Sequence, residues 1–185
     1  MPIIEVVTPG VAAITQLASK VGAERLGRTS LMKLLYFLQE VREVPLGYHF
    51  TLYSYGPFDS DVLSDLGTAE ALQAVETEVV PFSGGYRYKI DAGPSAEFIL
   101  KQKNEFLHRY SRDFDWVVDR FAAENPATLE LLSTIVYADR EEGAQADRSL
   151  EVLADRVHRV KPKFSEETIR TKIQLLKDMA IVLRD

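Results

Sequence analysis

The sequence predicts a mainly α-helical fold of the α+β class, with a winged-helix-like N-terminal half that includes a β-hairpin, packed on a helical C-terminal half. Apolar residues recur at three- and four-residue steps in several segments, which is typical of amphipathic helices. Over residues 9–91 the expected elements follow in the order helix, helix, strand, helix and hairpin, as in a winged helix. Only helical patterns follow Gly93-Pro94. We therefore predict a winged-helix-like subdomain at 1–93 and a helical subdomain at 94–185, forming one compact unit.

Two amphipathic helices are expected first. Residues 9–21 carry a row of apolar side chains on one face, and a second helix begins where Thr29 or Ser30 can cap it. Pro45 ends this second helix. A short strand is predicted over residues 49–55, because apolar and polar side chains alternate there.

A turn is predicted at Tyr55-Gly56-Pro57-Phe58-Asp59, leading into a third helix. Asp59 is the expected N-cap, because a carboxylate accepts hydrogen bonds from the free N–H groups of the first turn. The side chains expected to face inward are those of Val62, Leu63 and Leu66.

A β-hairpin is predicted over residues 75–90, around Gly84-Gly85, because a glycine pair readily adopts the positive φ angles of a two-residue turn. One face of this hairpin would be dry and the other charged. The dry face would hold Val79, Pro81, Tyr86, Tyr88 and Ile90, and the charged face Glu76, Glu78, Arg87 and Lys89.

The C-terminal half is predicted to begin with one long helix rich in aromatic residues that ends at Asn125. Pro126 would then open the next helix, since proline suits the first helical position. Residues 138–148 are polar and acidic and are expected to form an exposed loop. A short helix follows, and Ser165 caps a last helix whose inward side chains are Ile169, Ile173, Leu176, Ala180 and Leu183.

Composition narrows the function classes. The chain has 185 residues with 46% hydrophobic and 27% charged residues, which is ordinary for a globular protein. It has no cysteine, which excludes disulfides, thiolate nucleophiles and cysteine-ligated metal sites. The net charge of −6 repels nucleic acid at long range. No secretion signal and no long apolar run is recognisable, so a cytoplasmic protein with no membrane contact is expected.

No catalytic motif is recognisable in the sequence. The three histidines, His49, His108 and His158, are far apart and lack the spacing of metal ligands. Neither a nucleophile elbow nor a phosphate-binding glycine loop is present. We therefore assign no catalytic residue, no metal and no cofactor, and expect that the protein is not an enzyme.

Four segments carry a family resemblance: Leu31-Met32-Lys33-Leu34-Leu35-Tyr36-Phe37-Leu38-Gln39, Pro45-Leu46-Gly47-Tyr48, Leu52-Tyr53-Ser54-Tyr55-Gly56-Pro57-Phe58 and Lys161-Pro162-Lys163-Phe164-Ser165. With these segments the chain resembles the YwgA-like family of uncharacterised bacterial proteins, which is distantly similar to the SocA-type antitoxin, or Panacea, domain. The resemblance implies a helix-rich cytosolic protein of bacterial or phage origin. It also implies an antitoxin or adaptor role, in which the chain binds another protein.

Two groups of residues are candidate contact sites. The first, for a protein partner, is Tyr53, Tyr55, Gly56, Pro57 and Asp59, in which a rigid corner presents aromatic and acidic side chains. The second, for a phosphate or an acidic partner, is Arg156, Arg159, Lys161 and Lys163. A structural role is favoured for the second group, because cationic side chains near a helix C-terminus interact favourably with the helix dipole.

The leading functional hypothesis is a non-enzymatic protein-binding regulatory module, antitoxin-like or an adaptor, whose partner is a toxin or a protease substrate. A DNA-binding transcriptional regulator of the winged-helix type is the alternative. It is disfavoured because the helix after Asp59 carries Asp61, Asp65 and Glu70 and has no basic residue before Ala74. An enzyme with an unrecognised site is the second alternative. The many apolar helix faces also favour a homodimer.

Overall fold

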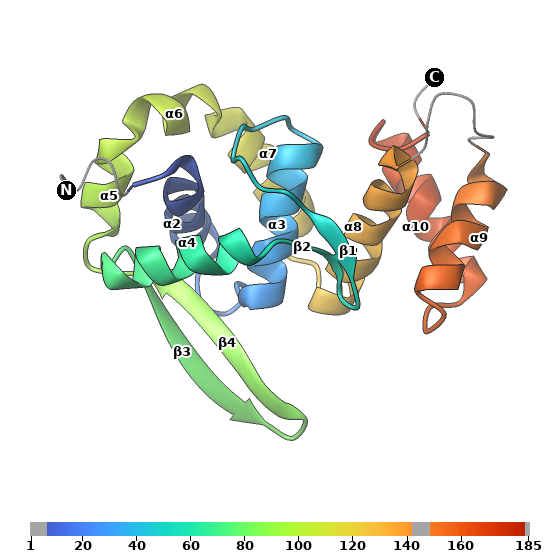
Figure 1. The fold of residues 1–185 in the computed structure, drawn as a ribbon, viewed down its shortest axis with the longest axis horizontal. Coiled ribbons are helices and arrows are strands. Elements are labelled where there is room, and N and C mark those ends of the chain that lie inside the picture. The colour runs from blue at the N-terminus through green and yellow to red at the C-terminus, as the bar shows by residue number, and fades with distance from the viewer. Residues whose placement is uncertain (1–6, 142–148, 184–185) are drawn as a thin grey trace. The chain divides into compact units, whose positions relative to one another are not determined.

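The computed structural model describes residues 7–141 and 149–183, which form helices and two antiparallel strand pairs (Figure 1). The predicted class, mainly α with some β structure, is confirmed. The helices are α2 (Pro9–Val21), α3 (Arg28–Glu40), α4 (Ser60–Ala71), α5 (Ala96–Gln102), α6 (Asn104–Arg109), α7 (Ser111–Phe121), α8 (Pro126–Arg140), α9 (Leu150–Val160) and α10 (Glu166–Asp178). The strands are β1 (Thr51–Tyr53), β2 (Gly56–Phe58), β3 (Val75–Phe82) and β4 (Gly85–Ala92).

The described residues form two compact units, which divide the chain at other points than the boundary expected at residue 93. The first unit holds the described residues up to Phe50 together with Asp59–Asn125. The second holds Thr51–Phe58 together with the described residues from Pro126 onward. The short strand pair β1–β2 therefore belongs to a different unit from the elements on either side of it in the sequence. The winged-helix-like arrangement stays a prediction.

The core of the first unit lies between α2 and α3. Thr8 caps α2, accepting a hydrogen bond from the Val11 N–H at 3.0 Å, and Pro9 begins the helix as predicted. On α3 the ring of Phe37 stacks on Phe121 of α7, with ring centroids 4.2 Å apart. The expected cap of α3 is wrong: Gly27 precedes the helix, and the buried Ser30 lies inside it.

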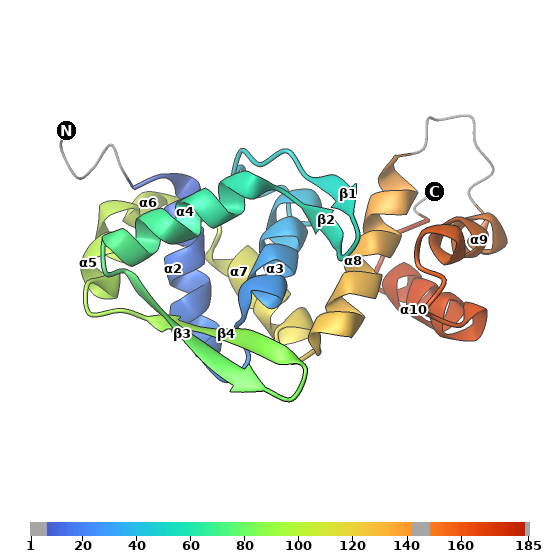
Figure 2. The same ribbon diagram turned by 60° about the horizontal axis from the view of Figure 1, so that its bottom comes forward.

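Three short helices replace the single long helix predicted before Asn125. The backbone leaves helical geometry at Lys103 and again at Tyr110, which separates α5, α6 and α7. Figure 2 shows these helices following one another around α2 and α3. Each of the three helices buries apolar side chains and contacts α2.

The β3–β4 hairpin pairs Phe82 with Gly85, so its turn residues are Ser83 and Gly84. The predicted faces are correct, because Val79 pairs with Tyr88 in the register. The prediction that the apolar face is dry is wrong. The side chains of Val79 and Tyr86 are 51% and 73% exposed, because the turn end of the hairpin projects beyond the helices (Figure 1).

The second unit is built around α8, which starts at Pro126 as predicted. Its buried side chains include Leu129, Leu132 and Ile135. Part of the predicted loop at 138–148 is helical, because α8 continues to Arg140, and residues 142–148 lie outside the described residues. Helices α9 and α10 pack on α8 and on each other.

The last helix is shorter than predicted. Ser165 caps α10 as expected, accepting from the Thr168 N–H at 3.2 Å. The helix ends at Asp178, where the chain turns through a positive φ of 54° at Ala180. Ala180 is therefore exposed rather than inward, and Ile181 and Val182 are buried in its place.

A polar contact joins α2 to α4 in the first unit. The Tyr48 hydroxyl donates to Asp65 Oδ2 at 2.9 Å, and the Thr8 hydroxyl donates to Oδ1 at 3.2 Å. Gly10 lies directly against this contact, where a Cβ atom would collide with the Asp65 carboxylate and the Tyr48 hydroxyl. A side chain at position 10 would therefore displace the hydrogen bond between Tyr48 and Asp65. Leu63, on the other side of α4, is exposed, against the prediction that it faces inward.

A matched pair of glycine substitutions tests this contact. Gly10→Ala should lower the free energy of unfolding by about 1–3 kcal/mol, the usual cost of overpacking a tight site. Gly67→Ala is the control, because its new methyl group would meet nothing within 4 Å. That change should raise the free energy of unfolding by about 0.5–1 kcal/mol, because alanine is more stable than glycine in the interior of a helix. Equal urea midpoints for the two variants would contradict the tight contact at Gly10.

Candidate functional site

The β1–β2 hairpin was not predicted as a hairpin. The strand expected over residues 49–55 is shorter in the structure, where it is β1 (Thr51–Tyr53), and part of the expected turn forms β2. Tyr53 pairs with Gly56 across a two-residue turn of Ser54 and Tyr55. Gly56 has a φ of +86°, a backbone conformation that residues other than glycine rarely adopt. Glycine at this position lets the chain reverse directly after Tyr55.

The hairpin rests on α8 through its backbone. A Cβ atom on Gly56 would lie 3.2 Å from the Thr134 hydroxyl oxygen and 3.3 Å from both the Glu130 carbonyl oxygen and the Ser133 hydroxyl oxygen. Gly56 and Pro57 are both buried. These two predicted contact residues therefore hold the hairpin against α8, and Figure 2 shows β1 and β2 beside that helix.

A buried carboxylate on α8 binds two lysines. Glu130 Oε1 lies 2.8 Å from Lys161 Nζ, and Oε2 lies 2.8 Å from Lys163 Nζ. The Lys161 ammonium also donates to the Ser54 carbonyl oxygen in the hairpin turn. Burial acts to raise the pKa of Glu130, but the hydrogen bonds and charges of Lys161 and Lys163 outweigh it and hold the pKa below its usual range.

The contact with Glu130 shows that the basic residues predicted as one cluster have different roles. Lys161 is only 4% exposed and serves the fold, whereas the Lys163 side chain is 53% exposed. Arg156 is also structural, because its guanidinium donates to the Ala138 carbonyl oxygen at 3.0 Å. Arg159 is exposed on α9.

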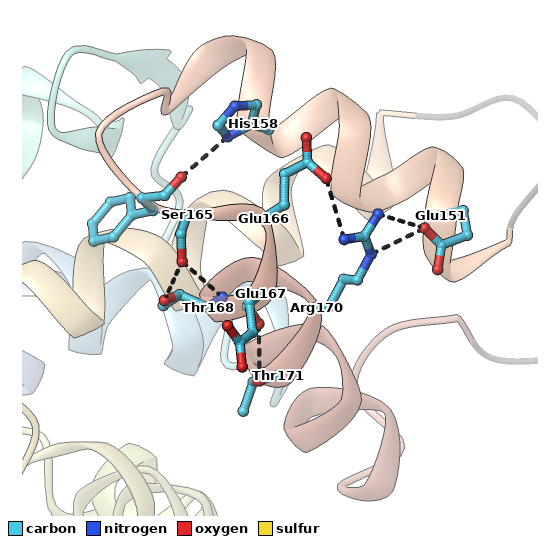
Figure 3. Close-up of polar contacts among 9 residues, drawn as sticks. Glu151, His158, Ser165, Glu166, Glu167, Thr168, Arg170 and Thr171 are labelled. Carbon is cyan, nitrogen blue, oxygen red and sulfur yellow. Dashed lines mark hydrogen bonds and ion pairs between the residues drawn. The ribbon is translucent and has the colours of Figure 1, made fainter.

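Polar contacts between α9 and α10 hold the connection that carries both lysines (Figure 3). The His158 Nδ1 atom lies 3.1 Å from the Phe164 carbonyl oxygen. The Arg170 guanidinium lies 2.9 Å from a carboxylate oxygen of Glu151 and 3.2 Å from one of Glu166. The His158 contact fixes the end of the connection that leads into α10, and the pair between Arg170 and Glu151 joins the two helices.

We define the Tyr–Lys surface as Tyr53, Tyr55, Lys163 and Phe164. The two tyrosines are 62% and 71% exposed. Lys163 Nζ lies 5.9 Å from the centre of the Tyr55 ring and 5.1 Å from that of Phe164, within range for cation–π attraction. The structure thus brings together residues from both groups that the sequence singled out.

Asp59 does not belong to this surface. It lies in the first unit, where its carboxylate caps α4 by accepting from the Asp61 N–H at 2.9 Å and also accepts from the His49 N–H at 2.5 Å. Its predicted capping role is therefore confirmed. Along α4, burial raises the pKa of Asp65, although the hydrogen bonds from Tyr48 and Thr8 oppose the shift.

A polar cleft of about 480 Å³ lies in the first unit, and no sequence pattern pointed to it. The Arg28 guanidinium lies over the Tyr88 ring, 3.6 Å from its centre. Two carboxylates, Glu70 from α4 and Glu76 from β3, line the same cleft. The remaining lining residues are Gln73, Val75, Thr77 and Val79.

Within residues 7–141 and 149–183, no group of three histidine, aspartate or glutamate side chains is placed to hold a metal ion. In the same part of the chain, no helix has the length and apolar character needed to cross a bilayer.

Comparison with known proteins changes the functional interpretation. The chain matches no family model. Over 146 residues it is 32% identical to a protein of Thermus aquaticus named DNA ADP-ribosyl glycohydrolase. The similar region covers 78% of this chain and 39% of the relative, so the chain spans about two fifths of the length of the protein it matches.

This similarity overturns the leading hypothesis. The relative is named as an enzyme, so the expectation of a non-enzymatic, antitoxin-like regulatory module is wrong. The error came from treating the absence of a known motif as the absence of a site. Side chains that line one cleft, such as those of Glu70 and Glu76, can come from separate elements that no motif connects. The resemblance to the YwgA-like family stays a prediction.

The two lysines bound to Glu130 offer a direct comparison. Lys161→Met should lower the free energy of unfolding by about 3 kcal/mol, because it breaks a buried ion pair and removes a hydrogen bond to the hairpin. Lys163→Met removes a half-exposed lysine from the same carboxylate and should cost less than about 1 kcal/mol. Urea unfolding measures both values. Similar losses for the two variants would show that burial does not distinguish them.

The lowered pKa of Glu130 makes stability depend on pH. Its ion pairs contribute fully above the ordinary glutamate pKa of about 4.5 and are lost as the pH falls through the lower pKa of the folded state. The stability difference between the protein and its Glu130→Gln variant should therefore shrink in acid. Glu97→Gln, at the exposed pair with Lys101, is the control and should show a much smaller difference. A difference for Glu130→Gln that stays constant down to about pH 2 would contradict this assignment.

Proposed function

We propose that this protein acts in the hydrolysis that removes ADP-ribose from DNA. The observation that carries the proposal is the 32% identity over 146 residues to a protein named for that reaction. The similar region includes most of this chain, so the similarity is not limited to one short motif. The reaction adds water across the bond between the ribose and the DNA. The ribose keeps the hydroxyl group, and the DNA keeps the proton.

The cleft in the first unit is the best candidate for the site of this reaction. Its volume of about 480 Å³ lies within the range of ligand pockets. The hydrolysis of glycosidic bonds commonly uses two carboxyl groups, one to donate a proton and one to activate water or stabilise the positive sugar. Glu70 and Glu76 supply two carboxyl groups to one cleft, and no ion pair within the described residues neutralises either of them.

The other side chains of the cleft suit a nucleotide. The guanidinium of Arg28, which lies over the Tyr88 ring, offers a flat cationic surface on which a base can stack. The Gln73 amide has both a donor and an acceptor, the pair of groups that an adenine edge requires. These features favour the adenosine end of ADP-ribose as the ligand.

Release of ADP-ribose from a modified oligonucleotide tests the proposal. The purified protein should release free ADP-ribose, measured by chromatography. Glu70→Gln and Glu76→Gln should each slow the reaction by about a hundredfold or more, the usual contribution of acid–base catalysis. Glu78→Gln is the matched control, because Glu78 lies on the same strand as Glu76 but does not line the cleft. No release at protein concentrations equal to the substrate would contradict the proposal.

A further inference from the structure

We infer that the Tyr–Lys surface of the second unit binds a single strand of DNA. The inference rests on the proposed function, because the relative's name supplies DNA as the macromolecule. The cleft and the Tyr–Lys surface belong to different units and share no residue. The surface would therefore bind DNA by contacts of its own, whether or not the strand carries ADP-ribose.

The exposed rings are the first argument. Tyr53 and Tyr55 lie on either side of Ser54 in one tight turn, and most of each side chain is open to solvent. Aromatic side chains on proteins that bind single strands serve as platforms on which bases stack. The bases of a duplex are already stacked on each other, so rings of this kind select an unpaired strand.

The charge of the surface is the second argument. Two ammonium groups, on Lys161 and Lys163, share the single carboxylate of Glu130, so one positive charge in this cluster remains unbalanced. Lys161 is buried, and the excess charge therefore reaches solvent at Lys163, beside the Tyr55 ring. A base stacked on Tyr55 would place its phosphate within reach of that ammonium group.

The rigidity of the turn is the third argument. The Lys161 ammonium donates a hydrogen bond to the Ser54 carbonyl oxygen, and Gly56 lies against α8. A turn held in this way loses little conformational freedom when a ligand binds, which favours binding. The Tyr53 ring also packs against Phe58, with ring centroids 5.4 Å apart, and still leaves most of its surface open to solvent.

Fluorescence anisotropy with a labelled, unmodified oligothymidylate at low salt tests the inference. The protein should bind it, and Tyr53→Ala and Tyr55→Ala should each weaken binding by about tenfold, as expected for the loss of one stacked base. Tyr55→Phe should keep the affinity, because stacking needs the ring and not the hydroxyl. Lys163→Gln should weaken binding and flatten its salt dependence, since about 0.7 of a counterion is released for each phosphate bound on a single strand.

Tyr86→Ala is the matched control. Tyr86 is as exposed as Tyr55, at 73% against 71%, and it also lies near the turn of a hairpin, but in the first unit. Its removal should leave the affinity unchanged. No binding of the oligonucleotide at low salt, or an equal loss on removing Tyr86, would overturn the inference.

The two proposals fail in different ways. If unmodified DNA binds through Tyr53 and Tyr55 but no ADP-ribose is released from modified DNA, the inference stands and the proposed reaction fails. If ADP-ribose is released but unmodified DNA is not bound, the Tyr–Lys surface has no role in holding the strand. A protein that binds this surface in place of DNA would give that second result.

Discussion

The second unit depends on one buried ion pair, between Glu130 and Lys161. It joins three segments that are far apart in the sequence: α8, the connection before α10, and the β1–β2 hairpin, whose turn carbonyl Lys161 also binds. Removing two charges from water costs several kcal/mol, so such a pair is favourable only when further hydrogen bonds complete it. Lys163 and the Ser54 carbonyl supply those contacts here. The position of the exposed tyrosines therefore follows from a contact in the interior.

This pair also shows what the sequence left open about the basic cluster. Lys161 and Lys163 are two residues apart, and each looks like a surface cation near the end of a helix. The folded chain distinguishes them, because Lys161 is buried where it binds Glu130 of α8, whereas Lys163 binds the same carboxylate from a half-exposed position. One signal was present, because Glu130 is the single charged residue in the segment from Leu129 to Val136. A carboxylate on a buried helix face requires a cationic partner, which is a reason to look for a lysine elsewhere in the chain.

Local patterns predicted the helices whose ends are set by local chemistry. The start of α2 at Pro9, that of α8 at Pro126 and the serine cap of α10 follow from the residues at those positions. The breaks between α5, α6 and α7 were not predictable in this way, since the spacing of apolar residues continues through them. The three helices each contact α2, and this tertiary arrangement is not visible in the local spacing. The cleft was missed for a related reason: it joins Arg28, Glu70 and Glu76 from three elements that no motif connects.

The net charge of −6 does not exclude action on DNA. At physiological salt the field of an exposed charge is screened within about 8 Å, so the charges beside a bound group matter more than the sum over the chain. The carboxylates of the cleft face a site proposed for a sugar, and carboxylates accept hydrogen bonds from sugar hydroxyl groups. The unbalanced lysine lies beside rings proposed to stack on bases, where a phosphate needs it. The excess acidic charge would then keep DNA from binding elsewhere, which favours weak and local contact over tight binding.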